Sequence, residues 1–338
     1  MKIYLVFLLL FVLITDNEAL GRTKNRVPPG PIPAHPSDGV PVTPPSAIFL
    51  STEAPSKVKT FPWTMKKEPS IRVKAGRRIH KLPLESYVTG VIGNEMGKNW
   101  PREALKAQSV AARSYALARM MKAGRRARYD VVASQADQVF RARDVKNEYL
   151  AGIVAETRGE ILWADGAVVE AYYSSTCGGK TRSAQNAGLD PDSPLTCSIT
   201  DASCKISPFR SWAFRLSLAA IENKMNKAGL GVVGLRKISA QKKDASGYVI
   251  SVYYQDSSGG YTITGAGLRN ILGSMTLKSL RFRILQQKDG MVLFSGNGFG
   301  HGVGLCQYGA KSMALKKGAY QSILKKYYRN TQMVKAYE

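Results

Sequence analysis

Long hydrophobic runs are missing from this chain of 338 residues, because no segment is apolar over the ~20 residues that a membrane-spanning helix needs. The apolar run from Ile3 to Ile14 is shorter, and it follows Lys2. This order is typical of a secretory signal, with cleavage near Ala19-Leu20-Gly21. We interpret residues 1–21 as a signal peptide or N-terminal anchor. No cysteine follows this run closely, which argues against a lipoprotein.

Acidic residues are also scarce, with 24 Asp and Glu against 49 Lys and Arg. The formal net charge of +25 favours an anionic partner, such as nucleic acid, an anionic membrane surface or a cell-wall polymer. Export to the periplasm or to the wall side of the membrane argues against nucleic acid. We expect a wall-polymer or membrane-surface contact at the cations Arg119, Lys122, Arg125, Arg126 and Arg128, for which scattered solvated charge is the alternative.

Internal repeats are absent, and the chain has no regular strand–helix alternation. Residues 22–69 are rich in proline and predict an extended, disordered linker. Residues 70–338 predict one α+β domain of interleaved helices and mainly antiparallel strands. We expect strands or hairpins at 71–74, 168–174, 248–254, 280–285 and 291–294, and helices at 84–96, 101–121, 307–316 and 320–328.

The spacing of Leu84, Val88, Val91 and Glu95 places these four residues on one face of the first expected helix. Three apolar neighbours draw the carboxyl inward, and burial raises the pKa of a carboxyl. A protonated carboxyl is what glycosidic cleavage needs as its general acid. On spacing alone, however, a Glu bonded to a backbone group or to an Arg at a helix end is the better interpretation.

Four sequence blocks favour the catalytic interpretation, because together they resemble the SpoIID/LytB family. They span residues 82–96, 100–116, 173–179 (Tyr-Ser-Ser-Thr-Cys-Gly-Gly) and 300–310 (Gly-His-Gly-Val-Gly-Leu-Cys-Gln-Tyr-Gly-Ala). The family includes SpoIID, a lytic transglycosylase of peptidoglycan, and LytB, described as an enhancer of a wall amidase. The resemblance implies that Glu95 is the catalytic residue.

The reaction implied by this resemblance uses one carboxyl, whereas most glycosidases use two. Glu95 would protonate the oxygen between N-acetylmuramic acid and N-acetylglucosamine and then accept the proton of the C6 hydroxyl, leaving a 1,6-anhydro ring. The sequence offers no obvious partner acid, and we expect Glu85 to be solvated. The alternative is a non-catalytic, wall-binding activator of a cell-wall amidase.

Six further residues are substrate-binding candidates, all within the family-like blocks: Gln108, Arg113, Ser175, Thr176, His301 and Gln307. For Arg113, a carboxylate of the muramic unit and a structural ion pair are equally good partners. Ser175 and Thr176 precede a tight Gly-Gly turn that would aim hydroxyls at a sugar, unless it is a plain strand end. His301 lies among glycines, which allow close approach to a ligand.

Four cysteines remain, and an even count in an exported protein suggests disulfides. A bridge between Cys197 and Cys204 is one interpretation. The other is a structural zinc held by Cys177, Cys197 and Cys204, as thiolates suit zinc and some SpoIID-type proteins have a Cys/His zinc site. We expect no required cofactor, and we expect Cys306 to be a buried thiol.

Overall fold

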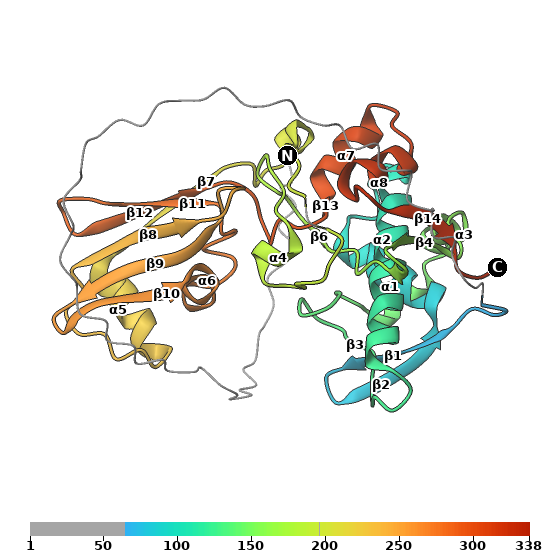
Figure 1. Cartoon of the computed structure of the whole chain (residues 1–338), viewed down its shortest axis with the longest axis horizontal. Coiled ribbons are helices and arrows are strands. Elements are labelled where there is room, and N and C mark those ends of the chain that lie inside the picture. The colour runs from blue at the N-terminus through green and yellow to red at the C-terminus, as the bar shows by residue number, and fades with distance from the viewer. Residues whose placement is uncertain (1–64, 196) are drawn as a thin grey trace, which may run out of the picture. The chain divides into compact units, whose positions relative to one another are not determined.

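The computed structural model describes residues 65–195 and 197–338. Helices and mainly antiparallel strands are interleaved without a regular alternation in these residues, which confirms the predicted α+β class (Figure 1). The predicted leader, residues 1–21, and most of the predicted linker lie outside the described residues. The described end of the linker is already part of the fold, because the Met65 N–H donates to the Ala336 carbonyl at 2.7 Å.

Helix α2 (Arg102–Ala123) runs through the first of two hydrophobic cores. It contacts α1 (Leu84–Glu95), α3 (Glu148–Ala155), α7 (Gln307–Leu315) and α8 (Tyr320–Tyr327) (Figure 1). Short side chains let these helices approach α2 closely, since its buried residues include Ala104, Ala107, Ala111, Ala112 and Ala116. The alanine stripe in the sequence therefore marks the centre of this core.

Two small sheets border the same core. In the first, β1 (Ser70–Ala75) pairs antiparallel with β2 (Arg78–Pro83) and parallel with β3 (Val131–Val132). In the second, β4 (Glu160–Ala164) lies between β14 (Gln332–Lys335) and β5 (Ala167–Val168). Two 3-10 helices, η1 (Ala142–Lys146) and η2 (Ala202–Ile206), and the short α4 (Ala184–Ala187) complete this part.

The second hydrophobic core is built from residues between η2 and Phe294. One sheet has the order β11-β12-β7 and another the order β10-β9-β8, all antiparallel. The strands are β7 (Trp212–Ser217), β8 (Lys237–Lys243), β9 (Val249–Asp256), β10 (Gly259–Thr264), β11 (Phe282–Gln286) and β12 (Met291–Gly296). Helices α5 (Leu218–Lys227) and α6 (Gly265–Leu272) supply the rest of this core.

A short parallel pair joins two of the family-like blocks that are far apart in the sequence. Strand β6 (Tyr173–Ser174) pairs with β13 (Leu305–Cys306), so that Cys306 lies opposite Ser174. The backbone before β13 packs tightly: at Gly304, with φ +67°, a Cβ atom would lie 2.0 Å from the Tyr172 carbonyl oxygen. A residue with a side chain would therefore disrupt this crossing.

The chain between β5 and β6 departs from the single expected strand over 168–174. It turns instead, with the Tyr172 N–H donating to the Glu170 carbonyl at 3.0 Å, and the buried Glu170 carboxylate binds Lys122 at 2.5 Å. Along the described part of the chain, no helix combines the length and apolarity needed to cross a membrane.

Candidate active site

Glu95 is the last residue of α1, on the face that carries the fully buried Leu84, Val88 and Val91. Burial raises the pKa of its carboxyl above the usual value of 4.5. Hydrogen bonds from the Val139 N–H, at 2.8 Å to Oε1, and from the Gln307 side chain act in the opposite direction and reduce the shift. The site thus holds a carboxyl that is protonated more readily than a solvated Glu and that still has donors for its ionised form.

Gln307 and Gln108 lie beside this carboxyl. Gln307 is the first residue of α7, and its Nε2 atom is 3.5 Å from Oε1 of Gln108 on α2. Both side chains are buried, and Gln108 is fully so. The Gln108 Nε2 atom finds no hydrogen-bond partner within the described part of the chain, so this fully buried amide has a donor left for an enclosed water.

Two tyrosines and a glutamine form a second layer around Glu95. The Tyr87 hydroxyl donates to Oε1 of Gln138 at 2.9 Å, and Nε2 of Gln138 donates to the Tyr173 hydroxyl at 2.9 Å. Burial, and then the nearby Glu95 carboxylate, raises the pKa of Tyr173 well above its usual value. The spacing of residues in the sequence did not indicate this layer, although Tyr173 opens one of the family-like blocks.

Ser175 and Thr176 are close to this group, but their hydroxyls differ in access. Thr176 is buried and its Oγ1 lies 2.6 Å from Oγ of Ser207. Ser175 is partly exposed, and its carbonyl accepts the Tyr308 N–H at 3.1 Å. Of these two predicted residues, only Ser175 is partly exposed.

His301 is partly buried beside Tyr172, with ring centroids 6.1 Å apart. Its Nδ1 atom accepts the Val303 N–H at 3.1 Å, and burial lowers the pKa of its imidazole to about 4. The ring is therefore neutral at neutral pH, and it holds the turn before β13 in place.

Arg113 forms a buried ion pair with Glu85. Its Nε and Nη2 atoms donate to the two oxygens of Glu85 at 2.9 and 2.7 Å, and the guanidinium is 0% exposed. Burial acts to raise the pKa of Glu85, but the charge of Arg113 and its hydrogen bonds outweigh this and lower the pKa. Glu85 also accepts from the Tyr337 hydroxyl at 2.6 Å. The expectation that Glu85 is solvated is therefore wrong. Of the two partners considered for Arg113, the structure shows the structural ion pair.

Three partly exposed aromatic rings, those of Trp100, Tyr308 and Phe209, form a cluster. Trp100 and Tyr308 meet edge to face with centroids 5.0 Å apart, and Phe209 is 6.4 Å from Tyr308. The Lys311 ammonium lies over the Trp100 ring, 4.8 Å from its centroid. Tyr308 directly follows Gln307, so these rings border the Glu95 group.

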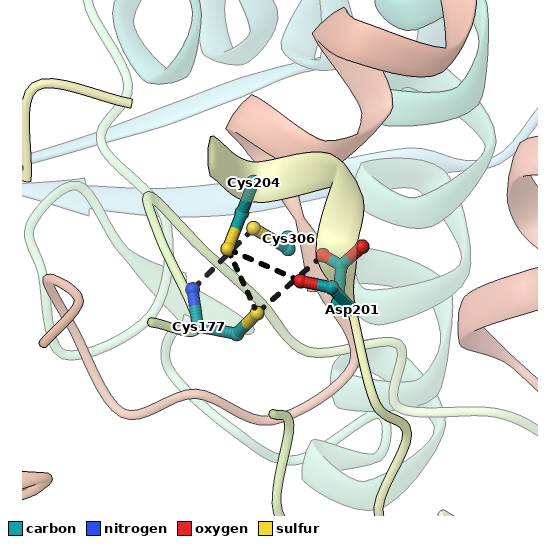
Figure 2. Close-up of side chains that lie close together, drawn as sticks. All are labelled: Cys177, Asp201, Cys204 and Cys306. Carbon is teal, nitrogen blue, oxygen red and sulfur yellow. Dashed lines mark hydrogen bonds between the residues drawn. The ribbon is translucent and has the colours of Figure 1, made fainter. Parts of the chain in front are cut away.

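Three cysteines and one aspartate form a separate, buried group (Figure 2). The donor atoms of Cys177, Asp201, Cys204 and Cys306 all lie within 4.8 Å of one another. Cys197, by contrast, is exposed and lies outside this group, and it forms no disulfide with Cys204. The predicted trio of cysteines is therefore not assembled, because Cys204 turns into the core on η2 while Cys197 stays at the surface.

The predicted cationic cluster is partly neutralised by neighbouring acids. Arg119 contacts Asp137 at 3.3 Å, and Lys122 contacts Glu170 at 2.5 Å and Asp190 at 3.0 Å. The three arginines beyond the end of α2, Arg125, Arg126 and Arg128, are exposed. An open concavity of about 850 Å³, lined mainly by residues of β7, β8, β11 and β12, is also basic. Its lining includes Lys243, Arg281 and Arg283 and none of the predicted site residues.

The chain is similar in sequence to a known family of proteins. The family model described as "Stage II sporulation protein" (SpoIID) matches residues 74–163, which include Glu95, Gln108 and Arg113. Stage II sporulation protein D of Bacillus subtilis is 30% identical over 277 residues, covering 78% of this chain and 77% of its own. The chain belongs to the SpoIID family.

Two further relatives of this SpoIID chain have other names. An uncharacterised protein of Brachyspira hyodysenteriae is 32% identical over 256 residues, 76% of this chain and 68% of its own. The protein named Amidase enhancer of Bacillus subtilis is 28% identical over 286 residues, 72% of this chain but 39% of its own. These two matches are longer than the match to residues 74–163, since they cover about three quarters of this chain.

Proposed function

We propose that this SpoIID protein is an exported peptidoglycan lytic transglycosylase that cuts glycan strands between N-acetylmuramic acid and N-acetylglucosamine. The observation that carries the proposal is the Glu95 carboxyl, whose pKa is raised by burial while two donors, the Val139 N–H and the Gln307 amide, face it. One group with these properties suits both halves of the reaction.

In the first half, protonated Glu95 donates its proton to the glycosidic oxygen as the bond from that oxygen to the muramic C1 breaks. Positive charge develops at C1, and the departing sugar takes both bonding electrons and the proton. In the second half, the Glu95 carboxylate accepts the proton of the C6 hydroxyl as the C6 oxygen bonds to C1. This closes a 1,6-anhydro ring and returns Glu95 to its protonated form.

The engagement of neighbouring acids supports a mechanism with a single carboxyl. Glu85 lies ten residues before Glu95 on α1, about 15 Å along the helix, and is held by Arg113 and Tyr337. Asp137 accepts from the Tyr115 hydroxyl at 2.8 Å and is paired with Arg119. Since both acids are already bound to protein donors, neither is poised to activate a water, and the substrate's own hydroxyl is the nucleophile that remains.

The surroundings of Glu95 suit a sugar chain. Binding sites commonly combine aromatic walls with a few aimed polar groups. The partly exposed rings of Trp100, Tyr308 and Phe209 would supply apolar faces, and the partly exposed Ser175 would supply a hydrogen bond. Lys311, above the Trp100 ring, would supply a cation for the lactyl or peptide carboxylate of a muramic unit.

A second candidate function is the activation of a cell-wall amidase without cleavage. The similarity to the protein named Amidase enhancer supports it. Under this alternative, the aromatic cluster would bind the wall or the amidase, and Glu95 would have no chemical role.

One experiment separates the two functions. Purified protein is incubated with peptidoglycan glycan strands, alone and with a wall amidase, and the products are analysed by mass spectrometry. We expect 1,6-anhydromuramic ends from the wild type and at least a 10²-fold loss of rate in Glu95→Gln, about the contribution of a general acid. Stimulated amidase activity without anhydro ends, unchanged in Glu95→Gln, would instead identify an activator.

A further inference from the structure

We propose that Cys177, Asp201, Cys204 and Cys306 bind a single Zn²⁺ ion in a tetrahedral site. The four ligands come from three segments: the turn after β6, the start of η2 and the end of β13. Figure 2 shows the three sulfur atoms and the Asp201 carboxylate directed toward one another. All four residues are buried, and their donor atoms lie within 4.8 Å of one another, which leaves room for one ion rather than a metal cluster.

The distances match a tetrahedron around zinc. Zn–S bonds of about 2.3 Å and Zn–O bonds of about 2.0 Å place two sulfurs about 3.8 Å apart, and a sulfur and an oxygen about 3.5 Å apart. The Sγ atoms of Cys177 and Cys204 are 3.7 Å apart, and Sγ of Cys177 is 3.4 Å from Oδ2 of Asp201. These two edges therefore have the lengths of the coordination polyhedron.

Two alternatives need no metal, and each leaves some of the four buried groups without a strong bonding partner. A disulfide between Cys177 and Cys204 would leave the Cys306 thiol and the Asp201 carboxylate buried beside it. Three neutral thiols would be weak donors around a carboxylate that already accepts from the Tyr327 hydroxyl at 2.8 Å and from Lys326 at 2.5 Å. A single ion engages all four groups, and thiolates with a carboxylate in a tetrahedron are a ligand set for zinc.

Neighbouring groups would compensate part of the charge of the proposed site. The Lys326 ammonium on Oδ1 of Asp201 offsets part of the negative charge that three thiolates and a carboxylate leave around a divalent ion. The Cys177 N–H points at Sγ of Cys306 over 3.4 Å, and such N–H contacts stabilise a thiolate. Outer partners of this kind orient metal ligands and are part of a built site.

The proposed ion would fasten the fold next to Glu95. Cys306 directly precedes Gln307, whose amide donates to the Glu95 carboxylate. Cys177 follows Ser175 and Thr176 in the turn after β6. The ion would thus link two family-like blocks, residues 173–179 and 300–310, to η2. It would also fix the position of Gln307 at the start of α7. The metal site does not depend on the proposed reaction, because its test measures metal and not cleavage.

The test begins with the metal content of the full chain, purified without chelators. We expect one zinc per chain by elemental analysis, and four thiols in the protein unfolded with chelator and no reductant. The matched control is Cys197→Ser, which removes the cysteine outside the group and should keep one zinc. Cys306→Ser and Asp201→Asn should each weaken zinc binding at least about tenfold in competition with a chromophoric chelator.

A second measurement keeps the proposal testable if a serine variant does not fold. Wild-type protein loaded with Co²⁺ should show thiolate charge-transfer absorption and the intense visible bands of tetrahedral cobalt, and Cys197→Ser should show the same spectrum. Wild-type protein that neither contains zinc nor takes up cobalt would overturn the site. So would a disulfide between Cys177 and Cys204, found as a crosslinked peptide lacking two hydrogens, or a loss of metal in Cys197→Ser equal to that in Cys306→Ser.

Discussion

The side-chain amide of Gln307 donates a hydrogen bond to the carboxyl group of Glu95, although the two residues lie in opposite halves of the chain. The bond favours the ionised carboxylate, whereas burial favours the protonated acid, and burial prevails. Glu95 is thereby balanced between the two forms that the proposed reaction uses in turn. Pairing of β6 with β13 brings the start of α7 to this place.

Replacing Gln307 with leucine should raise the pKa of Glu95 further, because the carboxylate loses a donor. In the pH profile of glycan cleavage, the alkaline limb should move to higher pH, and the maximum rate should fall, since the ionised form is less well supported. Cleavage of soluble glycan across a pH series measures both effects. Gln332→Leu, at an exposed position on β14, is the control for the same chemical change. An unmoved alkaline limb in Gln307→Leu would show that the amide does not act on Glu95.

Glu95→Gln should make the protein more stable than the wild type above neutral pH. A carboxyl whose folded pKa is raised contributes stability that is fully present below its unfolded pKa of about 4.5 and is lost as the pH rises through the folded value. The glutamine amide has no such titration. Denaturant unfolding of both proteins at pH 4 and pH 8 should therefore give curves that diverge at the higher pH. Equal pH dependence of both proteins would contradict the raised pKa.

Breaking the ion pair of Arg113 and Glu85 should cost stability rather than substrate affinity. Replacing one partner leaves a buried charge, so Arg113→Met or Glu85→Gln should each lower the free energy of unfolding by ~3–5 kcal/mol. The double variant should lose less than the sum of the two, because both charges are gone. KM for glycan in the folded fraction should stay near the wild-type value. A raised KM in Arg113→Met with unchanged stability would place Arg113 in the substrate site after all.

Binding to intact wall should weaken as salt increases, since exposed charges are screened over about 8 Å at physiological ionic strength. The exposed residues Arg125, Arg126 and Arg128 should carry part of this binding, and their joint neutralisation should reduce sedimentation with sacculi. Neutralising Lys316, Lys317 and Lys325, which are also exposed, is the control with the same charge change. An equal loss in both triple variants would assign the effect to net charge and not to this cluster.

Local patterns in the sequence were sufficient for the α+β class and for much of the first core. Helix α1 begins at Leu84 as predicted, and the alanine stripe marked α2 as a buried helix, because helix periodicity is a property of neighbouring residues. The same periodicity placed Glu95 on an apolar face. The sequence pattern did not reveal α5 and α6, which contribute to a core assembled from strands distant in sequence.

Partners across the fold were decided only by tertiary structure. Glu85 sits about 80° around α1 from Glu95 and so looked solvated, but the chain returns to cover it with Arg113 and Tyr337. Sequence proximity suggested pairing Cys197 with Cys204, whereas the fold brings Cys306 to Cys177 through the β6–β13 pair. Burial and ion pairing depend on which segments pack against one another in the folded chain. The spacing of residues within one segment does not predict which other segments will contact it.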